Sequence, residues 1–201
     1  MDRPARVGTL VISQNGPDWP FLSITGVGTR DLPLQSFLLL RHADMADETP
    51  AAEARIQTVN VAHTLGHALS QLFTAEKLTE IQIAKSLHAA HVVAVQTGTY
   101  YSAIASVLAG TRLVAAGIGR CTLQVQRGER VERLLLPTID DKMPEGSGVL
   151  RAALGIGFSD TEVRTCDTNL KALDSVMLMI GSYSPMEASD ATYSATLSMA
   201  Q

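Results

Sequence analysis

The order of hydrophobic and polar positions divides the chain into three parts. Short apolar runs, two of them rich in β-branched residues, predict strands at Val7 to Ser13, Phe21 to Val27 and Ser36 to Leu40. Residues 51–96 instead repeat apolar side chains three and four positions apart, which is the period of a helix. The rest of the chain returns to short strand-like runs. This succession favours an α+β fold over a βαβ alternation.

Two helices are predicted in the middle part. The first, Ala51 to Thr74, carries an apolar stripe that includes Leu65 and Leu69. The second, Leu78 to Gln96, repeats this spacing around Leu87. Because the connection between them is so short, we expect an antiparallel helical hairpin.

Six strands are expected after the helices. Glycines at turn positions separate the first four, as in an antiparallel meander. These four are Tyr101 to Leu108, Arg112 to Ala116, Thr122 to Gln126 and Val131 to Leu136. A compact Gly-rich turn, Leu154 to Gly157, then precedes the last two strands, Val176 to Ile180 and Thr192 to Met199.

Composition and charge narrow the range of functions. With 46% hydrophobic and 18% charged residues, the 201 residues fit a single globular domain, residues 1–201. A formal net charge of −4 offers no basic surface to a phosphate backbone, so nucleic-acid binding is not expected. No apolar run approaches the length of a membrane span, and no signal-peptide pattern is present. Two cysteines, Cys121 and Cys166, make no disulfide framework, which favours a reducing, cytoplasmic location.

Five short stretches, taken in order, carry a family resemblance. They are GTYYSA from Gly98, AAGIGRC from Ala115, LRAALG from Leu150, LDSVMLMIGS from Leu173 and SDAT from Ser189. They resemble the motifs G-T-T-A, V-G-D-S-R, L-T-R-A-L-G, G-D-x-L-L-L-C-S-D-G and D-N-x-T of the metal-dependent serine/threonine protein phosphatases, the PPM or type 2C family. Order and spacing agree over residues 35–200.

The resemblance implies a β-sandwich of two antiparallel sheets with an antiparallel helical hairpin on one face. It also implies that C-terminal helices are reduced or missing, because only the eight residues Ser182 to Ser189 separate the last two matching strands. One sheet face would then lack its helical cover. Large exposed apolar surfaces usually mark interaction sites, so we expect this face to bind a protein partner or a second copy of the chain.

The metal ligands of the family are largely missing from this sequence. Members hold two divalent ions with aspartates at the D-G, S-D-G and D-N motifs, and the ions activate a bridging water. Gly181 stands at the S-D-G aspartate and Ile118 at the V-G-D-S-R aspartate, whereas Asp190 remains in place. Arg41 to Met45 corresponds to the D-G-M-G-G loop and contains no D-G pair.

Three residues are weak substitutes for the lost ligands. Asp44 or His42 lies near the lost D-G motif, and Asp31 can replace the aspartate of the N-terminal N-E-D motif. Two dications about 4 Å apart repel each other by roughly 16 kcal/mol at an effective dielectric constant near 20, four times the unit-charge value. Bridging carboxylates normally offset this repulsion. We therefore expect no binuclear centre and no cofactor, with a single Mn²⁺ or Mg²⁺ as the alternative.

The sequence thus favours a catalytically inactive phosphatase-like domain, a pseudophosphatase, acting as a protein-binding or regulatory module. The alternative is a divergent metal-dependent protein phosphatase that uses Asp190 together with Asp44 or His42. A third hypothesis places a small molecule in the remodelled cleft. His63 and His67 have the spacing of zinc-binding helices but lack the intervening glutamate, so we expect packed or solvated side chains there.

Overall fold

The structure is a computed structural model that describes residues 6–10, 21–29, 32–42, 51–72, 78–138, 151–181 and 192–198. These residues form ten strands and two helices. In chain order the elements are β1 (Arg6–Leu10), β2 (Phe21–Thr29), β3 (Leu32–His42), α1 (Ala51–Leu72), α2 (Glu80–Thr97), β4 (Tyr101–Ala109), β5 (Arg112–Ile118), β6 (Cys121–Arg127), β7 (Arg130–Leu135), β8 (Arg164–Asn169), β9 (Ser175–Gly181) and β10 (Thr192–Ser198).

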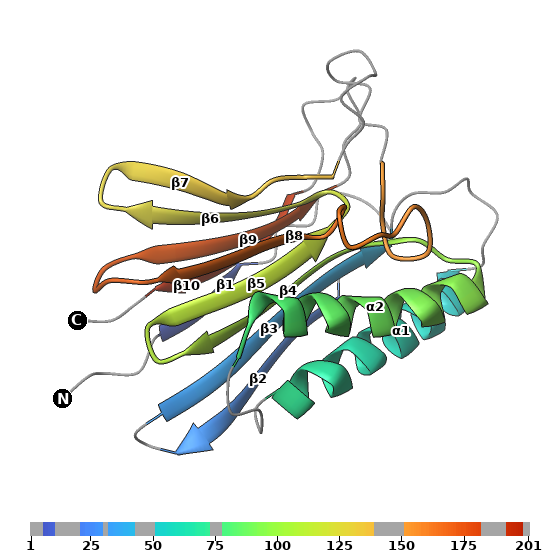
Figure 1. The fold of residues 1–201 in the computed structure, drawn as a ribbon, viewed down its shortest axis with the longest axis horizontal. Helices are drawn as coiled ribbons and strands as arrows, with labels where there is room; N and C mark the ends of the chain where they lie inside the picture. The colour runs from blue at the N-terminus through green and yellow to red at the C-terminus, as the bar shows by residue number, and fades with distance from the viewer. Residues whose placement is uncertain are drawn as a thin grey trace, which may run out of the picture.

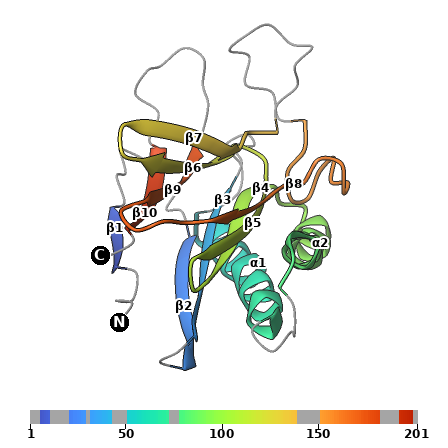
Figure 2. The same cartoon turned by 60° about the vertical axis from the view of Figure 1, so that its left-hand side comes forward.

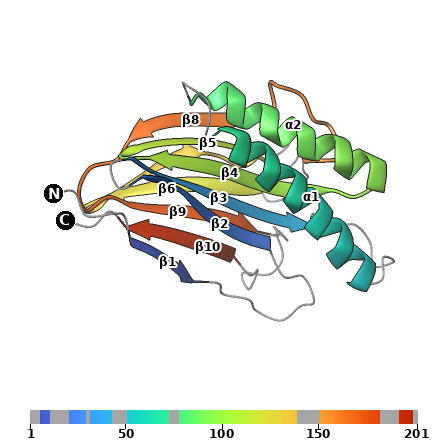
Figure 3. The ribbon, with the colours of Figure 1, turned by 90° about the horizontal axis from the view of Figure 1, so that it is seen from below.

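The strands form two antiparallel sheets of five strands each (Figure 1). The inner sheet has the strand order β2-β3-β4-β5-β8, and the outer sheet has the order β1-β10-β9-β6-β7. Both helices lie on the free face of the inner sheet, as Figures 2 and 3 show. The inner sheet is therefore the middle of three layers.

The two central strands of the inner sheet are buried on both faces. Residues 101–108 of β4 and residues 113–118 of β5 are all buried. Because successive side chains of a strand point to opposite faces, each of these strands contributes to two cores. One core fills the space between the inner sheet and the helices, and the other fills the space between the sheets.

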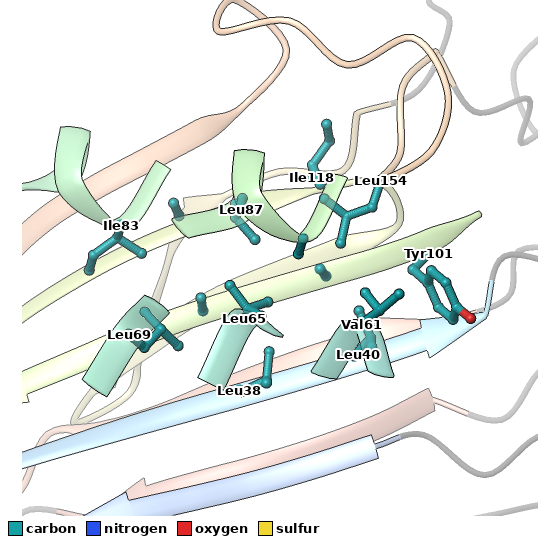
Figure 4. Close-up of a cluster of buried hydrophobic side chains, with 14 of the residues drawn as sticks. Leu38, Leu40, Val61, Leu65, Leu69, Ile83, Leu87, Tyr101, Ile118 and Leu154 are labelled. Atoms are coloured by element: carbon teal, nitrogen blue, oxygen red, sulfur yellow. The ribbon is translucent and has the colours of Figure 1, made fainter. Parts of the chain in front are cut away.

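Both ends of α2, the second helix of the hairpin, are capped. The Thr79 hydroxyl accepts the backbone N–H of Gln82, and the Gln82 side chain accepts the backbone N–H of Thr79 at 2.8 Å, which completes a capping box. Gly98 ends α2 in the left-handed conformation. The apolar stripes of both helices face the inner sheet (Figure 4). Large side chains in this contact include Leu38, Leu40, Val61, Leu65, Leu69, Ile83 and Leu87.

A tight turn fastens residues 153–157 to the start of β4. The backbone groups of Leu154 and Tyr101 exchange two hydrogen bonds of 2.9 and 3.0 Å. Gly155 adopts φ 94°, and a Cβ added there would lie 2.1 Å from the carbonyl oxygen of Thr99. The close approach of the two backbones therefore requires glycine at this position.

The same turn is held to α2 by a histidine. The backbone N–H of Gly155 donates to Nδ1 of His91 at 3.0 Å. The His91 ring stacks on Phe158, with ring centroids 4.6 Å apart. Burial, and to a smaller extent the neighbouring His88, lowers the pKa of His91. The lowered pKa favours the neutral ring, which can accept the Gly155 hydrogen bond.

The predicted α+β sandwich and helical hairpin are confirmed, and the expected strands and helices form. β3 is longer than expected, since it spans Leu32–His42 where Ser36 to Leu40 was predicted, whereas the other described ends shift by at most two residues. The expected ends at Ser13, Thr74 and Met199 lie outside the described residues. One strand, β8, has no counterpart among the predicted elements. Its sequence, RTCDTN, contains no apolar run, and as an edge strand it leaves most of its side chains exposed or half-buried. Neither of the two described helices combines the length and apolar character needed to span a bilayer.

The outer sheet carries no helix among the described residues (Figure 2). In β6 the side chains that alternate with the buried ones are Thr122, Gln124 and Gln126, and in β9 they are Met177 and Met179. This part of the uncovered face is thus polar apart from two methionines. The expectation that the face binds a partner stays a prediction, but the described parts of β6 and β9 are less apolar than we expected.

The turn at residues 153–157 offers a direct test of the fold. Gly155→Ala should lower the free energy of unfolding by about 3 kcal/mol, because the new Cβ meets the backbone of Thr99 and the φ angle disfavours L-residues. Gly128→Ala is the matched control, since Gly128 also has a positive φ, 61°, but no atom within 4 Å of the added Cβ. It should cost about 1 kcal/mol. Chemical denaturation of both variants checks this, and equal losses would contradict the close approach.

Candidate active-site end

Several strands meet at one end of the sandwich, and most motif positions that the structure describes lie there. β3, β5 and β9 end at this edge, and β4, β6 and β10 begin there (Figure 1). The register pairs His42 with Tyr101, Ala103 with Ile118, and Gly181 with Thr192. The fold therefore gathers the positions at which the resemblance places metal ligands.

Ile118 is part of the core between the inner sheet and the helices. Its side chain is fully buried and lies in the same cluster as Leu154 (Figure 4). Dispersion contacts and the exclusion of water hold this side chain in place. A carboxylate at position 118 would be buried among apolar groups, so the position has become structural.

Arg41 brings a positive charge to the same end, which the sequence analysis did not foresee. It is only 8% exposed. Phe37 and Leu39 of the same strand point into the core between the sheets, and strand alternation places Arg41 on that face, paired in register with Ser102 of β4. A guanidinium stays protonated in proteins. The sequence did contain a signal for this burial, because Arg41 follows Phe37 and Leu39 at every second position of a buried strand.

Cys121 lies in the core between the two sheets, close to this end. The thiol is buried beside Ile180, its partner in the register of β6 and β9. Burial raises the pKa of Cys121 to about 12. The sulfur is therefore a neutral thiol at physiological pH and not an activated nucleophile. Burial also raises the pKa of Cys166, on β8, to about 12.

The remaining candidates are placed only in part. Gly181 is the last residue of β9 and His42 the last residue of β3, so both backbones reach the site end. Asp31, Asp44 and Asp190 lie outside the described residues. Within the ranges that the structure describes, no three His, Cys, Asp or Glu side chains come together in a way that could hold a metal ion.

Solved structures share this arrangement of sheets and helices. The serine/threonine phosphatase PstP/Ppp of Mycobacterium tuberculosis is similar with a TM-score of 0.60 at 13% identity, over 98% of each chain. The PstP catalytic domain in complex with two manganese ions gives 0.63 at 14% identity, over 98% of this chain and 97% of that one. The serine/threonine phosphatase of S. agalactiae gives 0.62 at 11% identity, over 98% of both chains. This is the type 2C phosphatase fold.

Comparison of sequences adds no closer relative. No protein-family model matches the chain, and no curated protein matches it. At identities of 11 to 14% the structural likeness establishes the type 2C fold alone. The chemistry of this chain has to be argued from its own residues.

Motif residues that this chain retains support the backbone. Gly119, at φ 86° in the AGIGR stretch, lies against Ser102, whose Oγ accepts the backbone N–H of Arg120 at 2.9 Å. Arg151 of the LRAALG stretch pairs with the buried Glu162 at 2.7 Å. These contacts give Gly119 and Arg151 structural roles in this type 2C fold.

Residues of the LDSV stretch also have structural roles. Leu173 occupies the position of the glycine in the family motif G-D and keeps a glycine-like conformation, with φ 72°. Asp174 is buried, accepts the backbone N–H of Lys171 at 2.9 Å and lies 3.4 Å from Arg127. This carboxylate closes a turn and contacts an arginine from β6. Its role is structural.

The described residues do not fit a binuclear metal centre. A pair of dications requires anionic oxygen ligands. The motif positions that are described supply an apolar side chain at Ile118 and none at Gly181. We therefore derive no metal-dependent step for this chain.

The unusual backbone at Leu173 leads to a stability prediction. A left-handed L-residue costs about 1 to 2 kcal/mol, whereas glycine adopts this conformation freely. Leu173→Gly should therefore be more stable than Leu173→Ala by about 1 kcal/mol. The alanine variant is the matched control, because Leu173 is 63% exposed and both substitutions remove its side chain. Urea denaturation measures the difference, and an alanine variant as stable as the glycine variant would refute it.

Restoring the lost aspartate at the AGIGR stretch should damage the fold. Ile118→Asp places a carboxyl group in an apolar core and should lower the free energy of unfolding by about 4 kcal/mol or more. Ile118→Val is the control and should cost about 1 kcal/mol. Thermal and chemical unfolding measure both variants, and titration calorimetry tests Mn²⁺ binding. A stable Ile118→Asp variant that gained Mn²⁺ affinity would show that position 118 faces a metal site after all.

Proposed function

We propose that this chain is a phosphatase-fold domain without phosphatase activity that acts by binding another protein. The observation that carries the proposal is the character of its site end. At the two described positions where the resemblance places an aspartate, the residues are a core isoleucine, Ile118, and a glycine, Gly181.

The pattern of retained and lost motif residues supports this proposal. Gly119, Gly155 and Asp174 keep contacts that fix turns and strand ends. Two positions with no structural need for a carboxylate, 118 and 181, have lost it. A fold kept while its chemistry is removed fits a role in binding.

The alternative is a divergent phosphatase that holds one divalent ion. Its ligands would be Asp190, which precedes β10, with Asp44 or His42 after or at the end of β3. These elements do meet at the site end, which keeps this alternative worth testing. A single ion would activate water less effectively than a pair that stabilises both the attacking and the leaving oxygen.

The two free cysteines bear on where the protein acts. Both thiols are protonated and sit in strands whose register does not pair them with each other. We therefore keep a reducing, cytoplasmic location as part of the proposal.

An activity assay with metal separates the two candidates. The purified chain, incubated with p-nitrophenyl phosphate and Mn²⁺ or Mg²⁺ beside an active type 2C phosphatase, should release no nitrophenol above the buffer control. Titration calorimetry with the same ions should show no saturable binding tighter than about millimolar. Both results follow from the missing anionic ligands.

A pair of aspartate variants guards against contaminating activity. Asp190→Ala removes the retained motif aspartate, and Asp160→Ala removes an exposed aspartate elsewhere in the chain. Turnover that Asp190→Ala abolishes and Asp160→Ala leaves intact would establish the divergent phosphatase and end the proposal. Turnover that survives both changes would come from a contaminant.

A further inference from the structure

The outer surface of the two helices carries most of the exposed large apolar side chains that the structure describes. Five of the nine are Ile56, Val59, Ile81, Val92 and Val95. We call the exposed side chains of α1 and α2 the helix face. Its members are Glu53, Ile56, Val59, Asn60, His63, His67, Ser70, Gln71, Ile81, Lys85, His88, Val92, Val95 and Gln96.

The helix face is one continuous surface. On each helix the exposed positions lie opposite the buried stripe, as the 3.6-residue period requires: Ile56 and His63 opposite Leu65, and Ile81 and Val92 opposite Leu87. Both helices lie side by side in one layer over the inner sheet (Figure 3). The apolar side chains of α1 and α2 therefore project in the same direction, away from the protein.

This surface is poor in charge for an exposed pair of helices. The sequences of α1 and α2 contain only Glu53, Arg55, Glu80 and Lys85 as charged residues. Solvent-exposed helix faces are normally charged and polar. Depletion of charge with enrichment of apolar side chains is instead typical of the core of a protein interface.

The dimensions of the helix face suit an interface of ordinary size. Helices of 22 and 18 residues are about 33 and 27 Å long, and two adjacent helices are about 20 Å wide. The flat outline is thus roughly 600 Å², and side-chain relief raises the accessible area toward the about 800 Å² per partner of a stable interface.

We propose that the helix face binds the helix face of a second copy of the chain, forming a two-fold symmetric dimer. The charges on the face favour this occupant. Glu53 lies in the first turn of α1 and Lys85 near the beginning of α2, so the antiparallel hairpin holds them at opposite ends. A two-fold axis that lies in the plane of the helix face, perpendicular to the helices, places each end of one hairpin over the opposite end of the second hairpin. Glu53 then shares an end with the partner subunit's Lys85, the two copies of Glu53 lie at opposite ends, and so do the two copies of Lys85.

This inference goes beyond the proposed function, because dimerisation through the helices does not depend on whether the site end holds metal. It also places self-association on the helix layer, not on the outer sheet face considered from the sequence. Ile56 and Val92 lie toward the end of the hairpin where α1 begins and α2 ends, so this axis buries them from each copy against the partner's opposite end, at two separate points.

Sedimentation velocity tests the dimer. The wild-type chain should sediment as a dimer at micromolar concentrations, and the double variant Ile56→Glu/Val92→Glu should weaken the dimer at least about 100-fold. Both positions are exposed in the protomer, so circular dichroism and thermal unfolding should stay unchanged. Val131→Glu is the matched control, because Val131 is 58% exposed on β7 and should leave the dimer intact.

Charge exchange tests the direction of the two-fold axis. Glu53→Lys should weaken the dimer about 3- to 10-fold, and adding Lys85→Glu to it should restore the affinity. A chain that is monomeric at all concentrations, or a dimer that survives Ile56→Glu/Val92→Glu, would overturn the proposal. Failure of the second charge change to restore the dimer would overturn the stacking of opposite ends.

Discussion

Burial of both faces of β4 and β5 is the constraint on which the rest of this structure depends. A strand between two cores can tolerate polar side chains only where they find partners. Its helix side is therefore built from small and branched residues, with Ala103 and Ala105 letting the helices approach closely and Ile118 closing the end of the layer.

The same constraint separates structure from chemistry in a type 2C fold. Catalytic ligands come from strand ends, where the layers open, whereas stability comes from the layers themselves. Substituting a side chain that lies outside both cores leaves the layers untouched. Replacing Gly155 or Gly119 does not, because their backbones touch Thr99 and Ser102. This asymmetry distinguishes residues that hold turns and strands in place from positions where a side chain can change without moving the layers.

The sequence predicted the elements whose hydrophobic pattern repeats over many residues. It missed the features that depend on individual contacts. Leucine spacing on α1 and α2 and the apolar runs of β4 and β5 are long signals, so those elements were foreseen. β8 was not, because its strand character comes from pairing with β5 and not from apolar side chains. The sequence analysis assigned Arg41 to a loop motif, although the alternation of side chains along β3 is enough to place it on a buried face. The approach of His91 to Gly155, from distant parts of the chain, has no sequence signal at all.

The exposed apolar side chains of the helix face distinguish this chain from a phosphatase-fold protein that binds no partner. If the chain were only a relic, drift on the outer helix positions would favour lysine and glutamate, which are good helix formers and keep a surface soluble. The opposite is found, since β-branched residues of lower helix propensity stand at Ile56, Val59, Ile81 and Val92 while the buried positions already hold the helices down. Exposed residues that cost both solubility and helix propensity need a compensating contact, and the described protomer does not supply one at these four positions. The proposed dimer through the helix face would supply such a contact.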